Sequence, residues 1–121
     1  MKSLVNFLFE VGMLKRTPRT GFQFLGSGKE SVAEHSYRTA VIGYTLSLRE
    51  EGADSLKTTL MCLFHDLPEA RTGDHNYVNK RYVKVDEDRA VKDLAGTLPF
   101  APDLLDLTRE FNAGTSLEAC I

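Results

Sequence analysis

A histidine and an aspartate stand side by side in the stretch Leu63-Phe64-His65-Asp66-Leu67-Pro68-Glu69, at the end of an apolar run. If this segment is helical, Asp66 and Glu69 lie on the same face, because residues three apart are neighbours on a helix. His65 and Asp66 point about 100° apart, so both reach one point only from a helix end that faces a cleft. Burying such a polar cluster without partners costs free energy, and the upstream His35 is one candidate partner.

Two histidines and one aspartate, His35, His65 and Asp66, suit a borderline divalent transition metal such as Mn, Co, Zn, Fe or Ni. Three protein ligands leave coordination positions open, which is typical of a catalytic site rather than a closed structural one. A metal there would lower the pKa of bound water and polarise a phosphoryl or carbonyl oxygen. Glu69, one turn further on, would position that water or carry its proton.

Each of these residues also has a plainer interpretation. A His-Asp pair commonly marks a hydrogen-bonded helix end, His35 alone fits a core or capping histidine, and His75 fits a loop. Arg19 lies in the basic loop of residues 16–30, which is either a solvated loop or an anion-binding loop beside an active site. Spacing alone leaves these interpretations open.

The elements that must position these residues are all expected to be helices, about five in number. The apolar periodicity, the caps and the Pro and Gly breaks predict helices over residues 3–15, 31–51, 54–72, 78–97 and 101–113. Ser31 and Glu34 form a Ser-x-x-Glu capping box, which places His35 in the first turn of its helix. Pro68 cannot donate to the carbonyl of Phe64, so we expect a kink directly after the His-Asp pair.

The helix over residues 31–51 carries two apolar stripes that we expect to be buried on a wide face: Tyr37, Val41, Tyr44 and Leu48, and beside them His35, Thr39, Ile42 and Leu46. The next helix carries a third stripe with helical spacing, which comprises Leu56, Leu60, Leu63 and Leu67. The inward positions expected over residues 78–97 and just after are Val85, Ala90, Val91, Leu94 and Leu98.

The composition is that of an ordinary globular domain of 121 residues, with 42% hydrophobic and 26% charged residues. A net charge of −2 gives no general attraction to nucleic acid or to anionic membranes. No apolar run approaches the roughly 20 residues that span a bilayer. The two cysteines, Cys62 and Cys120, are far apart in sequence, so we expect reduced thiols and a cytoplasmic setting.

Three linked motifs carry a resemblance to a known family: Ser31-Val32-Ala33-Glu34-His35, Phe64-His65-Asp66-Leu67-Pro68-Glu69-Ala70 and Thr72-Gly73-Asp74. In this order they resemble the HD-domain metal-dependent phosphohydrolases, and are most similar to the branch that includes the 5′-deoxynucleotidases. The loop Leu14-Lys15-Arg16-Thr17-Pro18-Arg19-Thr20-Gly21 also resembles the stretch before the first histidine in that branch. The resemblance implies an all-α, HD-domain-like bundle.

The resemblance also implies a role for each matched residue. His35, His65 and Asp66 would bind one divalent transition metal, Glu69 would handle the nucleophilic water, and Asp74 would support the site or the substrate. Arg19 would hold the phosphate, and Phe22 would replace the aromatic residue that the family places near the sugar.

The resemblance predicts a hydrolase of a nucleotide phosphomonoester, such as a (deoxy)nucleoside 5′-monophosphate. A non-catalytic ligand-binding or regulatory module and a hydrolase of a pyrophosphate-bearing signalling nucleotide are the alternatives. We expect a small-molecule nucleotide as the partner, no nucleic-acid or membrane partner, and a homodimer.

A second capping box, Thr115-Ser116-Leu117-Glu118, predicts a helix start only three residues before Ile121. We therefore expect residues 1–121 to be a single domain that lacks a further C-terminal helix. By the resemblance, that helix would provide an aspartate as the fourth protein ligand of the metal.

Overall fold

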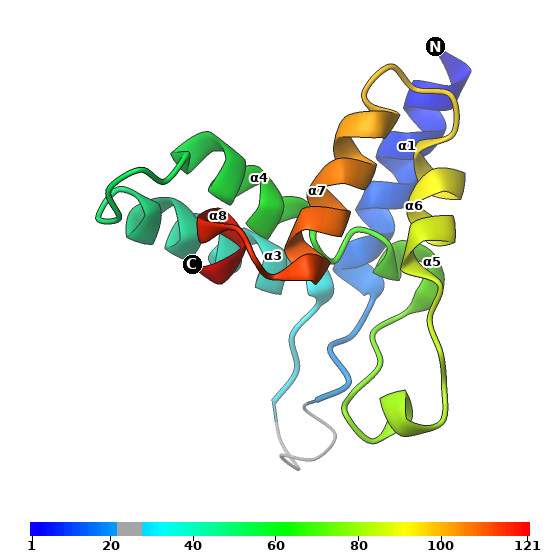
Figure 1. The fold of residues 1–121 in the computed structure, drawn as a ribbon. Coiled ribbons are helices and arrows are strands. Elements are labelled where there is room, and N and C mark those ends of the chain that lie inside the picture. The colour runs from blue at the N-terminus through cyan, green and yellow to red at the C-terminus, as the bar shows by residue number, and fades with distance from the viewer. Residues whose placement is uncertain (22–27) are drawn as a thin grey trace.

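The computed structural model describes residues 1–21 and 28–121, and Phe22 lies outside the described residues. Within these ranges the regular elements are helices, apart from one isolated bridge between Pro18 and Ser31. The predicted all-α fold is therefore confirmed (Figure 1). In chain order the helices are α1 (Lys2–Gly12), η1 (Met13–Arg16), α3 (Val32–Ser47), α4 (Ser55–Phe64), α5 (Glu69–Thr72), η2 (Asn79–Arg81), α6 (Glu87–Ala95), α7 (Ala101–Ala113) and α8 (Leu117–Cys120).

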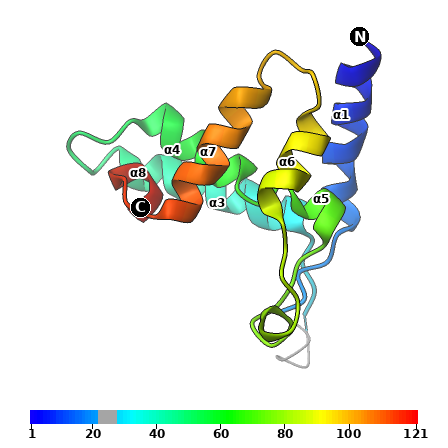
Figure 2. The ribbon, with the colours of Figure 1, turned by 45° about the vertical axis from the view of Figure 1, so that its right-hand side comes forward.

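The longer helices form two groups. α1, α6 and α7 stand side by side, whereas α3 and α4 pack on each other and run crosswise to them (Figures 1 and 2). α4 also packs against α7, and the short α8 contacts both of these helices. The end of α4 and the start of α3 therefore lie where the two groups meet.

The main core fills the space at this junction. Its buried side chains come from α1, η1, α6, α7 and the loop between these last two helices, and also from the first residue of α3 and the turn after α4. They are Phe7, Leu14, Val32, Leu67, Val91, Leu94, Ala95, Leu98 and Leu104. Burying each large apolar side chain contributes about 1.5–3 kcal/mol. This core anchors both chain segments that carry the predicted site.

Four of the inward positions expected around α6 are buried as predicted, Ala90, Val91, Leu94 and Leu98.

The face of α3 that packs on α4 is made of small residues. Its buried positions after Val32 are Ser36, Ala40, Gly43 and Ser47. A Cβ atom at Gly43 would collide with the Cys62 sulfur of α4, so the two helices approach closely at this point.

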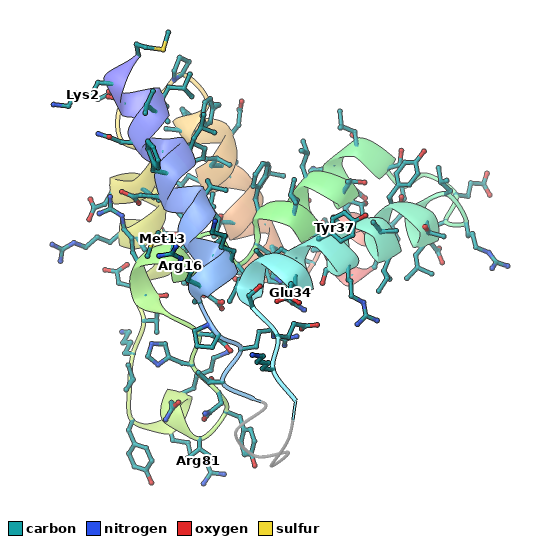
Figure 3. All side chains as sticks on the ribbon, turned by 180° about the vertical axis from the view of Figure 1, so that it is seen from behind. Lys2, Met13, Arg16, Glu34, Tyr37 and Arg81 are labelled. Atoms are coloured by element: carbon teal, nitrogen blue, oxygen red, sulfur yellow. The ribbon has the colours of Figure 1, made fainter. Side chains whose placement is uncertain are left out.

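The prediction that the apolar stripes of residues 31–51 are buried was wrong. Tyr37 is 69% exposed and Leu48 63%, and the other large apolar side chains of both stripes, Val41, Ile42, Tyr44 and Leu46, are also exposed. Figure 3 shows Tyr37 on the outer side of α3. In the third stripe Leu67 is buried, but Leu56 and Leu63 are exposed. Periodicity identifies an apolar face, but the described helices pack on the small-residue face of α3 instead.

Several helix ends also differ from those predicted. α3 ends at Ser47, and a turn follows that ends at Gly52 with a φ of +86°, which glycine adopts without steric cost. The kink expected after the His-Asp pair is a complete break, because α4 ends at Phe64 and α5 begins at Glu69. The helix expected over 78–97 is reduced to η2 and α6, since the Asp86 side chain caps α6 by accepting a hydrogen bond from the Arg89 backbone.

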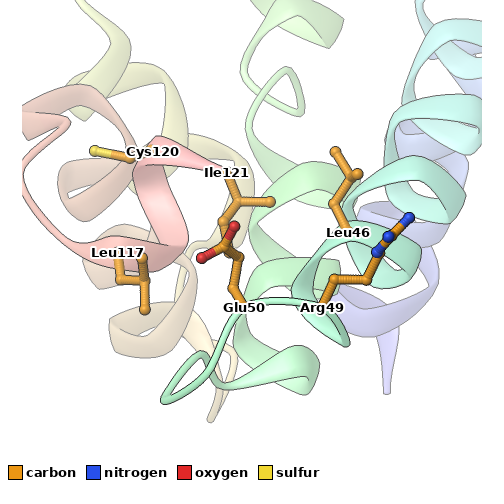
Figure 4. Close-up of a pocket in the computed structure, with 6 residues that line it drawn as sticks. All are labelled: Leu46, Arg49, Glu50, Leu117, Cys120 and Ile121. Carbon is orange, nitrogen blue, oxygen red and sulfur yellow. The ribbon is translucent and has the colours of Figure 1, made fainter.

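The chain near Ile121 forms a single helical turn, α8. Its cap is Ser116, which accepts a hydrogen bond from Ala119 N, and not Thr115 as the capping-box pattern predicted. A pocket of about 450 Å³ lies between α8 and the end of α3 (Figure 4). Within residues 1–21 and 28–121, no helix combines the length and the apolar character needed to cross a lipid bilayer.

Candidate metal centre

His65 is the residue directly after α4, and its ring is held by the backbone. Its Nδ1 lies 2.7 Å from the Cys62 carbonyl oxygen, which can only accept a hydrogen bond, so Nδ1 carries a proton. Its Nε2 then faces Asp66, with the Oδ2 atom 3.1 Å away. The break of the helix after Phe64 thus turns both side chains toward one point, as a helix end facing a cleft was predicted to do.

His35 reaches the same point from the first turn of α3. The predicted capping box is present: Glu34 N donates to Ser31 Oγ at 3.1 Å, and Ser31 N donates to the Glu34 carboxylate at 3.0 Å. This cap fixes the start of the helix and the position of the ring. The Nε2 atom of His35 lies 3.4 Å from Asp66 Oδ2.

The three side chains form a group that can hold a metal ion. One ligand atom each from His35, His65 and Asp66 lies within 4.8 Å of the others. Two imidazole nitrogens and one carboxylate oxygen are the donors that borderline divalent transition metals accept. The chemistry of this donor set therefore fits the expected cofactor, and the predicted convergence is present.

The charges around Asp66 favour its ionised form. Burial alone would raise its pKa, but the hydrogen bond and the positive charge of His65 outweigh this and lower the pKa. Burial alone would lower the pKa of His65, yet the hydrogen bond and charge of Asp66 raise it overall. His35 behaves differently, because burial and the nearby charge of Arg19 lower its pKa. Without an ion, Asp66 is therefore paired mainly with His65.

Glu69 begins α5, and its carboxyl group is neutral near pH 7 when no ion is bound. Burial first, and then the charges of Asp66 and Asp74, raise its pKa from 4.5 to about 9. In its protonated form it shares a hydrogen bond with Asp66. Glu69 is therefore a protonated carboxyl group beside the three candidate ligands when no ion is bound, and its role toward the nucleophilic water stays a prediction.

Arg19 is not a freely solvated loop residue. One nitrogen of its guanidinium, Nη1, lies 3.1 Å from Glu30 Oε1 and 2.8 Å from His35 Nδ1. About 38% of the Arg19 side chain is exposed, so the guanidinium is accessible at the edge of the site. The structure thus places a cation directly beside the candidate ligands.

Asp74 holds the Arg19 segment against the end of α5. Its carboxylate accepts a hydrogen bond of 2.9 Å from the backbone N–H of Thr20. This contact joins residues 54 positions apart in the sequence, and the supporting role of Asp74 stays a prediction. Through its charge Asp74 also acts on Glu69.

Sequence reasoning did not identify Glu30 or Phe111 as site residues. Glu30 lies one residue before the capping box, and the antiparallel pairing of Pro18 with Ser31 brings it to Arg19. Phe111 belongs to α7, and its ring lies 4.7 Å from the His65 ring, centroid to centroid. No local spacing connects Phe111 to His65, since the contact depends on how α7 crosses α4.

The comparisons with known proteins agree with this geometry. A family model described as "HD domain" matches residues 11–121. The chain belongs to the HD domain family. The first histidine, the His-Asp pair and the break after it all lie inside the matched region.

Individual relatives extend the comparison. A protein named "5′-deoxynucleotidase HDDC2" from Bos taurus is 34% identical over 124 residues, which cover 98% of this chain and 60% of the relative. The chain therefore spans about 60% of the length of this curated relative. A solved structure of a conserved hypothetical protein from Pyrococcus furiosus is 32% identical, with a TM-score of 0.81 over 95% of this chain and 70% of that one. A "predicted metal-dependent phosphohydrolase" from Magnetospirillum magnetotacticum is 26% identical, with a TM-score of 0.78 over 98% of this chain and 63% of that one.

Proposed function

We propose that this HD-domain chain is a metal-dependent phosphohydrolase that cleaves a nucleotide phosphomonoester, with a (deoxy)nucleoside 5′-monophosphate as the preferred substrate. The observation that carries the proposal is the convergence of His35, His65 and Asp66 on one point. The names of the relatives support the substrate class, because several of them are 5′-deoxynucleotidases.

His35, His65 and Asp66 would hold the ion in this proposal. A divalent ion supplies a Lewis acid for the phosphoryl oxygen and lowers the pKa of bound water. Glu69 is the carboxyl group beside the ligands that is not a ligand itself. The positive charge of a bound ion would favour its ionised form, which would accept the proton of the attacking water. Arg19 binds the phosphate oxygens, for which its planar fork of donors is suited.

Asp74 has a positioning role in the proposal. By accepting the hydrogen bond of Thr20 N, it fixes the segment that carries Arg19 relative to Glu69. Phe22 is proposed to contact the sugar of the nucleotide.

Phosphate release from a panel of nucleotides, each with Mn, Co, Zn, Fe or Ni added, tests the proposal. We expect metal-dependent release from 5′-monophosphates and a preference for the deoxy series. Arg19→Ala should raise KM, and should lower kcat if its contact tightens in the transition state. No release from any nucleotide, although the ion binds, would favour the non-catalytic module. Release of pyrophosphate from a signalling nucleotide would favour the other alternative.

The finer partner and compartment assignments are also proposals. A homodimer is supported by the large apolar side chains exposed on α3 and α4, such as Tyr37, Leu48 and Leu56, because extended apolar surfaces commonly mark interfaces. A cytoplasmic setting is supported by the two free cysteines. Sedimentation equilibrium tests the dimer, and a monomer at all concentrations would contradict it.

A further inference from the structure

The two candidate histidine ligands differ in the position of their ring proton. In His65, Nδ1 donates to the Cys62 carbonyl, so loss of any proton from Nε2 leaves a lone pair facing Asp66. In His35, Nδ1 lies 2.8 Å from Arg19 Nη1. A guanidinium has only donors, so His35 Nδ1 must accept, and the neutral ring carries its proton on Nε2.

This arrangement of His35 is incompatible with metal binding through Nε2. A neutral imidazole that binds an ion through one nitrogen carries its proton on the other. His35 would therefore need its proton on Nδ1, and two donors, Nδ1–H and the guanidinium, would then face each other. The Arg19 contact must be given up when Nε2 becomes a ligand.

Glu30 is the carboxylate beside His35 Nδ1 and can accept a hydrogen bond from Nδ1–H. The Thr39 hydroxyl lies 3.5 Å from the same nitrogen, but it donates its own hydrogen to the His35 carbonyl and carries no charge. The Oε1 atom of Glu30 lies 4.0 Å from His35 Nδ1 and 3.1 Å from Arg19 Nη1, so the same guanidinium nitrogen contacts both the acid and the ring. The Glu30 side chain is 17% exposed, and Arg38 is its other cation, 4.0 Å from Oε2. Metal-binding histidines generally donate their second ring N–H to a carboxylate, a carbonyl or a water.

We propose that Glu30 is the positioning residue of His35: when Nε2 of His35 binds the ion, Glu30 accepts a hydrogen bond from Nδ1–H. Arg19 is thereby released to bind an anion. The inference rests on the metal site of the proposed function. Glu30 and Arg19 then act in opposite directions on metal affinity: Glu30 stabilises the metal-binding tautomer of His35, and Arg19 stabilises the other one.

Zinc affinity of the purified chain, measured by competition with a chelator, tests the roles of both residues. Glu30→Ala should weaken zinc binding about 10–100-fold, as loss of such partners typically does, and Glu30→Gln should weaken it less. Glu51→Gln is the control for the lost negative charge, because Glu51 is exposed on the turn after α3. Arg19→Ala should strengthen zinc binding more than Arg38→Ala, which removes the same charge from the other side of Glu30.

The tautomer of His35 gives a second readout, which needs no variant and no substrate. Nitrogen NMR of the labelled wild-type chain should show the proton of His35 on Nε2 without zinc and on Nδ1 with zinc. Unchanged nitrogen signals of His35 on zinc binding, or Glu30 variants that bind zinc as tightly as Glu51→Gln, would overturn the inference and leave the proposed function standing. A wild-type chain that binds no zinc and none of the other ions would overturn the proposed function itself.

Discussion

At His65 the carbonyl of Cys62 fixes one ring proton, and this detail prepares the ring for a metal before any ion is present. The neighbouring Asp66 is kept ionised by His65, and Glu69 is kept protonated by its burial and by Asp66 and Asp74. Asp66 and Glu69 are both carboxyl groups close to His65, yet the first is ionised and the second is neutral. The differences come from burial and from neighbours, and not from the residue types alone.

Glu69→Ala should retain the ion and lose most of the turnover. A positioned acid or base typically contributes about 10²–10⁴-fold in rate, so kcat should fall by that order. Metal content and kcat are measured on the same sample, with Glu51→Gln as the control. Near-normal kcat at unchanged metal content would remove Glu69 from the mechanism.

Glu69 should also make the metal-free protein less stable as the pH rises. Its pKa is about 9 in the folded chain and near 4.5 when unfolded, so between these values the folded state binds more protons. The free energy of unfolding must then fall with increasing pH over this window. Glu69→Gln keeps a donor for Asp66 and removes the titration, so at about pH 8 it should be more stable than the wild type, by on the order of 1–3 kcal/mol.

Urea unfolding of the two metal-free proteins from about pH 4 to pH 9 measures this difference. The advantage of the variant should disappear toward the acid end, where Glu69 is protonated in both states. A constant difference across the whole range would mean that Glu69 titrates normally.

At the scale of the helices, the site depends on where α3 begins and where α4 ends. The start of α3 could be predicted from the sequence, because Ser31 and Glu34 form a local cap. The end of α4 at Phe64 could not, because the loss of one helical hydrogen bond at Pro68 indicated only a kink within a helix that was expected to continue to residue 72. The buried face of α3 was also missed, because small residues carry a weak apolar signal.

Gly43 should be required for the close approach of α3 and α4. Gly43→Ala adds a methyl group against Cys62 Sγ. Overpacking typically costs about 1–3 kcal/mol, whereas the gain in helix propensity is about 1 kcal/mol, so we expect net destabilisation. In a Cys62→Ala background the sulfur is absent, and Gly43→Ala should become neutral or stabilising. A double-mutant cycle of unfolding free energies measures this, and an equal effect of Gly43→Ala in both backgrounds would contradict the close contact.

At the scale of the whole molecule, the site is assembled from segments far apart in sequence. Arg19 meets His35 through a loop, Thr20 meets Asp74, and α7 brings Phe111 to His65. Motif order indicated the candidate ligands, but none of these tertiary contacts has a local signal. The large apolar side chains of α3 are exposed in the described chain, and the pocket beside α8 is open to solvent (Figure 4). The chain spans about 60% of the length of the Bos taurus relative.

The central claim is that His35, His65 and Asp66 bind one divalent ion together. Anomalous diffraction from crystals of the zinc-loaded chain tests it most directly. We expect one strong peak about 2.0–2.2 Å from Nε2 of each histidine and from a carboxylate oxygen of Asp66. An anomalous map with zinc bound elsewhere, and no peak between these three side chains, would contradict the claim.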